Sequence, residues 1–130
     1  MMTSPYEKYR QSSVQTATPA QLLIMLYDGA IRFARTAIDG ISKQDYEKSN
    51  LNFGKAQNIV KELMITLDQT YEVSKGLYAL YEYINYLLVE ANVHKSQEKV
   101  EEAIGYLTEL RETWLQASKI AANQPEITHG

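Results

Sequence analysis

The sequence of 130 residues contains no cysteine and only two histidines. The absence of cysteine excludes disulfide bonds, thiolate metal sites and covalent haem attachment, and a reducing compartment is tolerated. Glu90 and His94 stand four residues apart, but a di-iron bundle needs a second such pair, and the other histidine is His129. A solvated Glu–His pair at a helix end explains these two residues more simply. We therefore expect no enzyme activity, no metal and no cofactor, although a cofactor-binding bundle stays open as an alternative.

Long apolar runs and excess positive charge are also missing. The longest purely apolar run is Leu22–Tyr27, far short of the roughly 20 residues that span a bilayer. The first residues lack a basic region followed by an apolar core, so no signal peptide is expected. The formal net charge of −3 argues against a nucleic-acid binder. These features predict a cytoplasmic protein without membrane insertion.

The composition is that of one folded domain. Forty-five per cent of the residues are hydrophobic and 22% are charged, which is an ordinary balance for a globular chain. Ten tyrosines stand against two phenylalanines and one tryptophan. Tyrosine suits positions where the ring is buried and the hydroxyl meets water, including protein interfaces.

The clearest local signal begins at Thr18. Its hydroxyl can accept a hydrogen bond from the first helical turn while Gln21 reaches back, and Pro19 fits the first helical position. The helix that follows, to about Ile41, is apolar over most of its circumference, with a polar stripe of Asp28, Arg32, Arg35 and Asp39. Either this helix is central and covered by the others, or part of its surface binds a partner.

Three further helices are expected, from Asp45 to Leu67 or Asp68, from Ser74 to about His94, and after the Ser96 cap until Pro125. The last one carries apolar residues in steps of three and four, as in a coiled-coil seam: Val100, Ala103, Leu107, Leu110, Trp114, Ala117 and Ala121. Short connections favour antiparallel neighbours. The sequence predicts an all-α, antiparallel four-helix bundle over 18–122, a flexible N-terminal arm over 1–17 and a C-terminal tail over 123–130.

Two apolar seams contain amide side chains. The first consists of Tyr46, Asn50, Phe53, Gln57, Val60, Met64 and Leu67, and the second of Tyr81, Asn85, Leu88 and Asn92. An amide sealed in a core costs a few kcal/mol unless it is fully hydrogen-bonded, whereas an amide in a groove can bond a docked helix. The alternative is that these amides lie at the seam edge and meet water.

The N-terminal arm carries Tyr6 and Tyr9, which no local packing explains. They could anchor the arm in a groove, or they are incidental. With the apolar first helix and the amide seams, they indicate a protein that binds an amphipathic segment, helix in groove.

These residues resemble the FliS family of flagellar secretion chaperones. The resemblance covers about Tyr6 to Leu115, and its most specific part is Thr16-Ala17-Thr18-Pro19 leading into Met25-Leu26-Tyr27-Asp28-Gly29. Weaker matches follow in the family's order: Lys55-Ala56-Gln57-Asn58-Ile59, Leu80-Tyr81-Glu82-Tyr83, Glu90-Ala91-Asn92 and Leu110-Arg111-Glu112-Thr113-Trp114.

The resemblance implies a cytosolic export chaperone. It would bind the C-terminal segment of flagellin, prevent premature polymerisation and present the complex to the flagellar export gate. We expect the partner-binding residues to be Tyr6, Tyr9, Leu22, Met25, Tyr27, Asn50, Gln57, Tyr81, Asn85, Leu88 and Asn92. The arm is expected to cover part of the groove until flagellin displaces it, and two copies could pair as a homodimer without client. A chaperone for another exported helical protein is the alternative.

Overall fold

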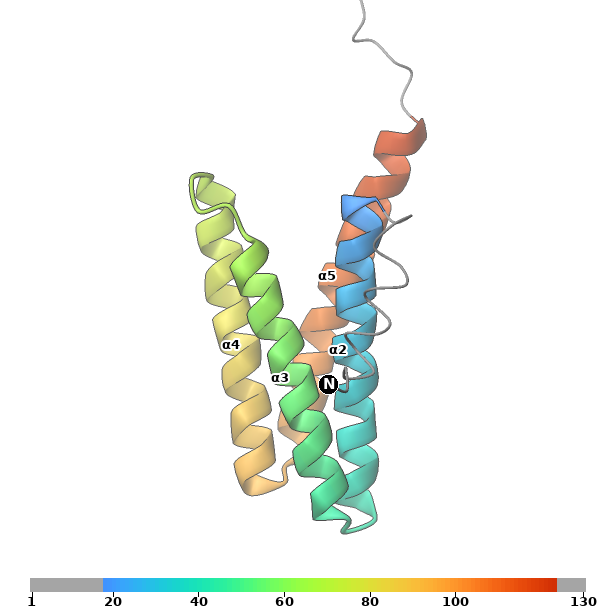
Figure 1. The fold of residues 1–130 in the computed structure, drawn as a ribbon, viewed down its shortest axis with the longest axis vertical. Helices are drawn as coiled ribbons and strands as arrows, with labels where there is room; N and C mark the ends of the chain where they lie inside the picture. The colour runs from blue at the N-terminus through green and yellow to red at the C-terminus, as the bar shows by residue number, and fades with distance from the viewer. Residues whose placement is uncertain (1–17, 124–130) are drawn as a thin grey trace, which may run out of the picture.

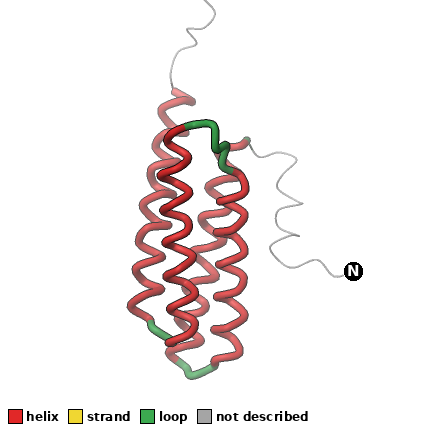
Figure 2. The backbone as a smooth tube through the Cα atoms, turned by 90° about the vertical axis from the view of Figure 1, so that its left-hand side faces the viewer, coloured by secondary structure: helices red, strands yellow, loops and turns green. Residues whose placement is uncertain are grey.

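The computed structural model describes residues 18–123. It contains four helices in that range, α2 (Pro19–Ser42), α3 (Tyr46–Thr66), α4 (Glu72–His94) and α5 (Gln97–Asn123). Each helix packs against its neighbours in a closed ring of four, α2 on α3, α3 on α4, α4 on α5 and α5 on α2. The α2–α3 and α4–α5 connections lie at one end and the α3–α4 connection at the other (Figure 2). The predicted all-α antiparallel four-helix bundle is confirmed; the predicted arm and nearly all of the tail lie outside the described residues.

Three helix starts follow from capping side chains. The Thr18 hydroxyl accepts from the Gln21 N–H at 3.1 Å, and the Gln21 side chain accepts from the Thr18 N–H at 2.9 Å. Asp45 caps α3 by accepting from the Lys48 N–H at 3.1 Å. Before α5, the Ser96 hydroxyl accepts from the Lys99 N–H at 3.3 Å. All three caps satisfy backbone donors that a helix cannot satisfy internally, and they confirm the starts expected at these residues.

α4 begins at Glu72, two residues before Ser74, near which the sequence predicted its start. Its N-cap is Tyr71, which makes no side-chain capping hydrogen bond. Ser74 instead lies within the first turn and is buried, with 5% of its surface exposed. At the other end Lys95 adopts a left-handed conformation, with φ 51°, and turns the chain toward α5.

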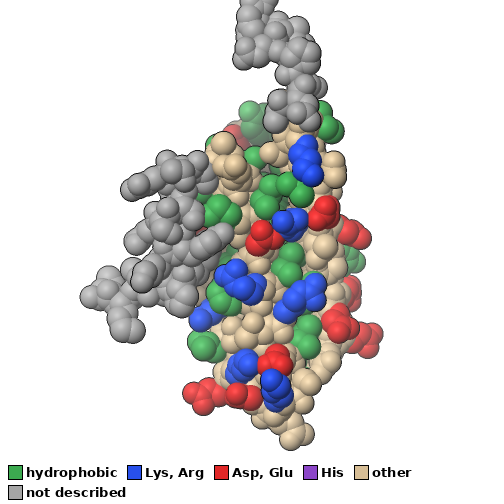
Figure 3. Space-filling model, turned by 90° about the vertical axis from the view of Figure 1, so that its right-hand side faces the viewer, with side chains coloured by type: hydrophobic (Ala, Val, Ile, Leu, Met, Phe, Trp, Pro, Cys, Tyr) green, Lys and Arg blue, Asp and Glu red, His purple; other side chains and the backbone are tan. Residues whose placement is uncertain are grey.

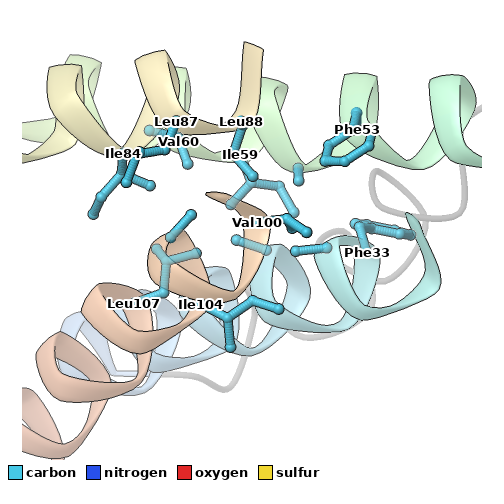
Figure 4. Packing of buried hydrophobic residues seen from close by; sticks show 14 of the residues in the cluster. Phe33, Phe53, Ile59, Val60, Ile84, Leu87, Leu88, Val100, Ile104 and Leu107 are labelled. Atoms are coloured by element: carbon cyan, nitrogen blue, oxygen red, sulfur yellow. The ribbon is translucent and has the colours of Figure 1, made fainter. Parts of the chain in front are cut away.

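The core runs along the bundle axis between the four helices. Phe33 and Phe53 lie at one end of the labelled cluster, and Ile84 and Leu107 lie toward the other, with aliphatic side chains between them (Figure 4). Leu107 and Ile84 are completely buried. Because this core comes from all four helices, no helix can bury its apolar face without the others.

The two helix pairs diverge along the bundle. In Figure 1, α3 and α4 lie close to α2 and α5 at the lower end and spread away from them toward the upper end, where α2 begins and α3 ends. α5 continues upward beyond its neighbours (Figure 1). The predicted seam of α5 is therefore only partly internal, since Ala117 and Ala121 are exposed while Leu107 is buried.

Candidate functional site

An apolar cleft lies between the first turns of α2 and the last turn of α3. It has a volume of about 360 Å³ and is lined mainly by large apolar side chains. The lining residues are Pro19, Leu22, Leu23, Leu26, Thr66, Leu67, Asp68, Tyr81 and Trp114. These residues come from all four helices and from the start of the α3–α4 connection, at the end where the helix pairs diverge (Figure 1). We call this site the open-end cleft.

Two aromatic side chains, Tyr81 and Trp114, form the floor of the open-end cleft, and both are hydrogen-bonded to Tyr27, which is buried beneath it. The hydroxyls of Tyr27 and Tyr81 are hydrogen-bonded to each other, and Trp114 Nε1 donates to Tyr27 Oη at 3.1 Å. Tyr27 is fully buried and Tyr81 is 1% exposed, so the buried hydroxyls are satisfied within the protein. Burial raises the pKa of both phenols above their usual value, and in Tyr27 the bond to Tyr81 adds to this effect. The floor is therefore neutral and rigid.

A second hollow, of about 490 Å³, has a different chemistry. It follows the polar stripe predicted on α2 and is lined by Asp28, Ile31, Arg32, Arg35, Thr36, Asp39 and Lys48. Figure 3 shows basic and acidic side chains interspersed on this side of the molecule. Asp28 is paired with Arg111 of α5, and Asp39 lies 2.6 Å from Lys48 Nζ. The hydrogen bond from Lys48 lowers the pKa of Asp39 and raises that of Lys48. This hollow is a solvated charged surface rather than an apolar groove.

The seam between α3 and α4 brings the predicted amides together. Lys95 Nζ donates to Asn92 Oδ1 at 2.6 Å and also to Asn50 Oδ1, so these two amides are bridged within the protein. Burial lowers the pKa of Lys95. Asn85 differs from them, because its Oδ1 is buried without a hydrogen-bond partner in the part of the chain that the structure describes. Gln57 is half-buried on α3.

The eleven sequence-predicted residues thus fall into separate places. Leu22 and Tyr81 line the open-end cleft. Met25 is half-buried on α2 and does not line the cleft. Tyr6 and Tyr9 lie outside the described residues.

Two of the expected contact residues require a correction. Tyr27 and Leu88 are fully buried in the core and cannot touch a partner in this conformation. Tyr81 shares this burial, at 1% exposed, and reaches the cleft only as part of its floor. The physical reason is that all three side chains face the centre of the bundle, where the four helices need large apolar volume.

The sequence pattern missed most of the cleft wall. Leu67 and Trp114 were assigned to helix seams and Leu23 to the apolar run of the first helix, and nothing in their spacing shows that the two helix pairs separate around them. Leu67 ends the apolar stripe of α3, and Trp114 lies near the end of the α5 seam. Apolar residues at the ends of several seams were the one available signal that this end could stay open.

The described residues contain no group of three or more His, Cys, Asp or Glu side chains that could hold a metal ion. His94 Nε2 lies 3.7 Å from Glu90 Oε1 at the end of α4, as the simpler interpretation of this pair predicted. Within residues 18–123, no helix combines the length and the hydrophobicity needed to cross a bilayer.

Comparison with known proteins agrees with this architecture. Residues 2–121 match the family model described as flagellar protein FliS. A flagellar secretion chaperone FliS of Bacillus subtilis is 43% identical over 114 residues, which cover 88% of this chain and 86% of that protein. The protein of the same name from Salmonella typhimurium is 33% identical over 117 residues, covering 88% and 87% of the two chains. A solved structure entitled "Crystal structure of flagellar chaperone from bacteria" superposes with a TM-score of 0.73 at 19% identity, over 88% of this chain and 94% of that one.

Proposed function

Because this chain belongs to the FliS family, whose curated relatives are flagellar secretion chaperones, we propose that its open-end cleft binds the C-terminal segment of flagellin. Bound in this way, the segment cannot pack against other flagellin molecules, and premature polymerisation is prevented. The chaperone then delivers its client to the flagellar type III export gate. This activity takes place in the cytosol and involves no catalysis.

The observation that carries this proposal is the apolar lining of the open-end cleft. Four leucines and one tryptophan surround about 360 Å³ at the end of a bundle whose core residues are buried. An amphipathic helix can place two or three anchor side chains in such a site. Ordering a free segment costs several kcal/mol, and burial of apolar surface offsets this cost at about 25 cal/mol per Å².

We further propose that the bound segment continues from the cleft along the α3–α4 seam toward Asn85. Tyr81 forms part of the cleft floor, and Asn85 lies one helical turn further along α4. The unpartnered Asn85 Oδ1 would accept a hydrogen bond from the client. A buried acceptor without a partner destabilises the free protein by about 1–3 kcal/mol, so such a bond would favour the complex. Asn50 and Asn92 are already bridged by Lys95, and their contact with a client requires that bridge to open.

A titration with the C-terminal flagellin segment tests the cleft. Leu22→Asp places a carboxylate in an apolar lining and should weaken binding at least about tenfold. The matched control is Leu51→Asp, because Leu51 is 57% exposed near the start of α3, at the opposite end of the bundle. Equal affinity of the two variants would place the client elsewhere. Flagellin polymerisation followed by light scattering gives the functional readout.

The same titration separates the alternatives. A chaperone for another exported helical protein would leave flagellin assembly unchanged and would bind a different client.

Two copies of the chain could also pair through the apolar surface of α2 when no client is bound. Sedimentation with and without the flagellin segment tests this homodimer, which the client should dissociate.

A further inference from the structure

Three tyrosines gather on the outer side of α4 and α5, away from the lining of the open-end cleft. The rings of Tyr83 and Tyr86 stack with centroids 6.1 Å apart and an interplanar angle of 21°. Tyr83 and Tyr106 make an edge-to-face contact with centroids 5.9 Å apart. Tyr83 is 42% exposed and Tyr86 is 52% exposed. We call Tyr83, Tyr86 and Tyr106 the tyrosine face.

The tyrosine face is held in place before any partner arrives. Tyr83 Oη donates a hydrogen bond to Glu102 Oε2 at 2.9 Å, which ties α4 to α5 at the surface. This bond to Glu102 raises the pKa of the Tyr83 phenol, so the ring stays neutral. Because the rings are fixed by stacking and by this bond, the tyrosine side chains lose little conformational entropy when a partner binds them.

The surroundings of the tyrosine face are mainly acidic. Glu102, Tyr106 and Glu109 recur at intervals of four and three residues and so share one side of α5. On α4, Glu90 lies four residues after Tyr86, although His94 is 3.7 Å from its carboxylate. Lys99, three residues before Glu102, is the one cation that this spacing places on the same side of α5 among the described residues. The balance is negative, which disfavours an anionic membrane or a nucleic acid as the occupant.

We propose that the tyrosine face is a second docking surface, which binds a helical segment of a partner protein that carries arginine side chains. α4 and α5 pack side by side, so a third helix can lie against both of them. A guanidinium can stack on an exposed tyrosine ring and bond a neighbouring carboxylate at the same time, whereas an ammonium group offers no planar surface. The second oxygen of Glu102 and the carboxylate of Glu109 are the acceptors for such bonds.

The proposal is independent of the open-end cleft. None of the three tyrosines lines that cleft, and no hydrogen bond joins them to its floor residues in the described structure. A chaperone that binds its client at the open end would keep the tyrosine face available for a different protein. Failure of the client to bind the cleft would therefore say nothing about the tyrosine face. Failure of a partner to bind the tyrosine face would likewise say nothing about the cleft.

The experiment uses a defined probe, an alanine-based helical peptide with arginines four residues apart, and a matched peptide with glutamates in their place. Binding to the full chain is followed by NMR of the tyrosine rings. We expect saturable shifts with the arginine peptide that weaken as salt is added, and none with the glutamate peptide. Tyr86→Ser and Glu102→Gln should each weaken binding about two- to fivefold, since one exposed cation–π contact or one ion pair is removed.

Two matched controls lie close by in the sequence. Glu101→Gln removes an exposed carboxylate from the adjacent position on another side of α5, and Tyr71→Ser removes a tyrosine that is 63% exposed at the start of α4. Both should bind the arginine peptide as the unmodified protein does. The assignment is overturned if the arginine peptide gives no saturable shift, or if the control variants lose as much affinity as Tyr86→Ser and Glu102→Gln. It is also overturned if sedimentation without peptide shows copies of the chain associating through this face.

Discussion

Trp114 of α5 donates a hydrogen bond from Nε1 to the hydroxyl of Tyr27 on α2, across 87 residues of sequence and at 3.1 Å. Tyr27 in turn bonds Tyr81 of α4. One polar chain therefore joins three helices at the floor of the open-end cleft. Since α2 and α4 belong to the two helix pairs that diverge at this end, the bond between Tyr27 and Tyr81 limits how far the pairs separate.

The Trp114–Tyr27 hydrogen bond should contribute measurably to stability. A double-mutant cycle of Trp114→Phe and Tyr27→Phe should give a coupling free energy of about 0.5–1.5 kcal/mol in urea unfolding, because each change removes one partner of the same bond. Tyr71→Phe is the control, since this side chain is 63% exposed, and its effect should stay within about 0.5 kcal/mol. Strict additivity of the two changes would show that the bond adds nothing.

Gly40 permits the close approach of α2 to the start of α3. A Cβ at this position would lie 2.7 Å from the Ser49 backbone nitrogen and 2.9 Å from the Asp45 carbonyl oxygen. Gly40→Ala should therefore lower the free energy of unfolding by about 1–3 kcal/mol, since backbone atoms cannot move aside easily. Gly54→Ala on α3 is the control, because nothing lies within 4 Å of its added Cβ.

The control should change stability in the opposite direction. Alanine is preferred over glycine in a helix interior by up to about 1 kcal/mol, so Gly54→Ala is expected to raise the melting temperature. A Gly40→Ala protein as stable as the parent would mean that α2 and α3 can separate at this turn without cost.

High pH should destabilise the protein through its buried tyrosines. Burial raises the pKa of Tyr27 and Tyr81 above the usual 10.0, so the folded state keeps protons that the unfolded state loses. This contribution to stability is fully present below pH 10 and declines as the pH rises above it. Spectrophotometric titration should show fewer ionised tyrosines in the native protein than in urea above that pH, with a difference that grows as the pH rises. Identical titration curves for the native and the urea-unfolded protein would contradict the burial of Tyr27 and Tyr81.

Asn85→Leu distinguishes a seam that receives the client from one that does not. It removes an unpartnered buried acceptor, so the free protein should become more stable or stay within about 1 kcal/mol. If the client bonds this amide, affinity for the flagellin segment should fall about three- to tenfold. Calorimetric titration measures the affinity and thermal unfolding the stability. Unchanged affinity would confine the client to the cleft.

Much of the fold could be predicted because its signals are local. Thr18 with Gln21, Asp45 and Ser96 fix helix starts through bonds within three residues, and the structure has all three. The predicted start of α4 was two residues late. Tyr71 provides no capping side chain, and Ser74, a residue type that often caps helices, is instead buried inside the first turn.

The site was less predictable because it depends on how helices diverge. Asn50 and Asn92 were assigned to two separate seams. Their bridge runs through Lys95, whose left-handed conformation no periodicity shows. Periodicity marks the core-facing side of a helix and cannot separate a buried Tyr27 from a cleft-lining Leu22, since α2 is apolar over most of its circumference.

The most direct test of the central claim uses Trp114, the sole tryptophan of the sequence, as a reporter inside the open-end cleft. A tryptophan-free peptide of the flagellin C-terminal segment is titrated in while Trp114 emission and heat are recorded on the same solutions. A client in the cleft should shift the emission to shorter wavelength, with the same midpoint in both signals, and Leu22→Asp should move both midpoints upward together. The account would be contradicted if binding released or absorbed heat while Trp114 emission stayed unchanged. It would also be contradicted if Leu22→Asp left both titration midpoints where they are.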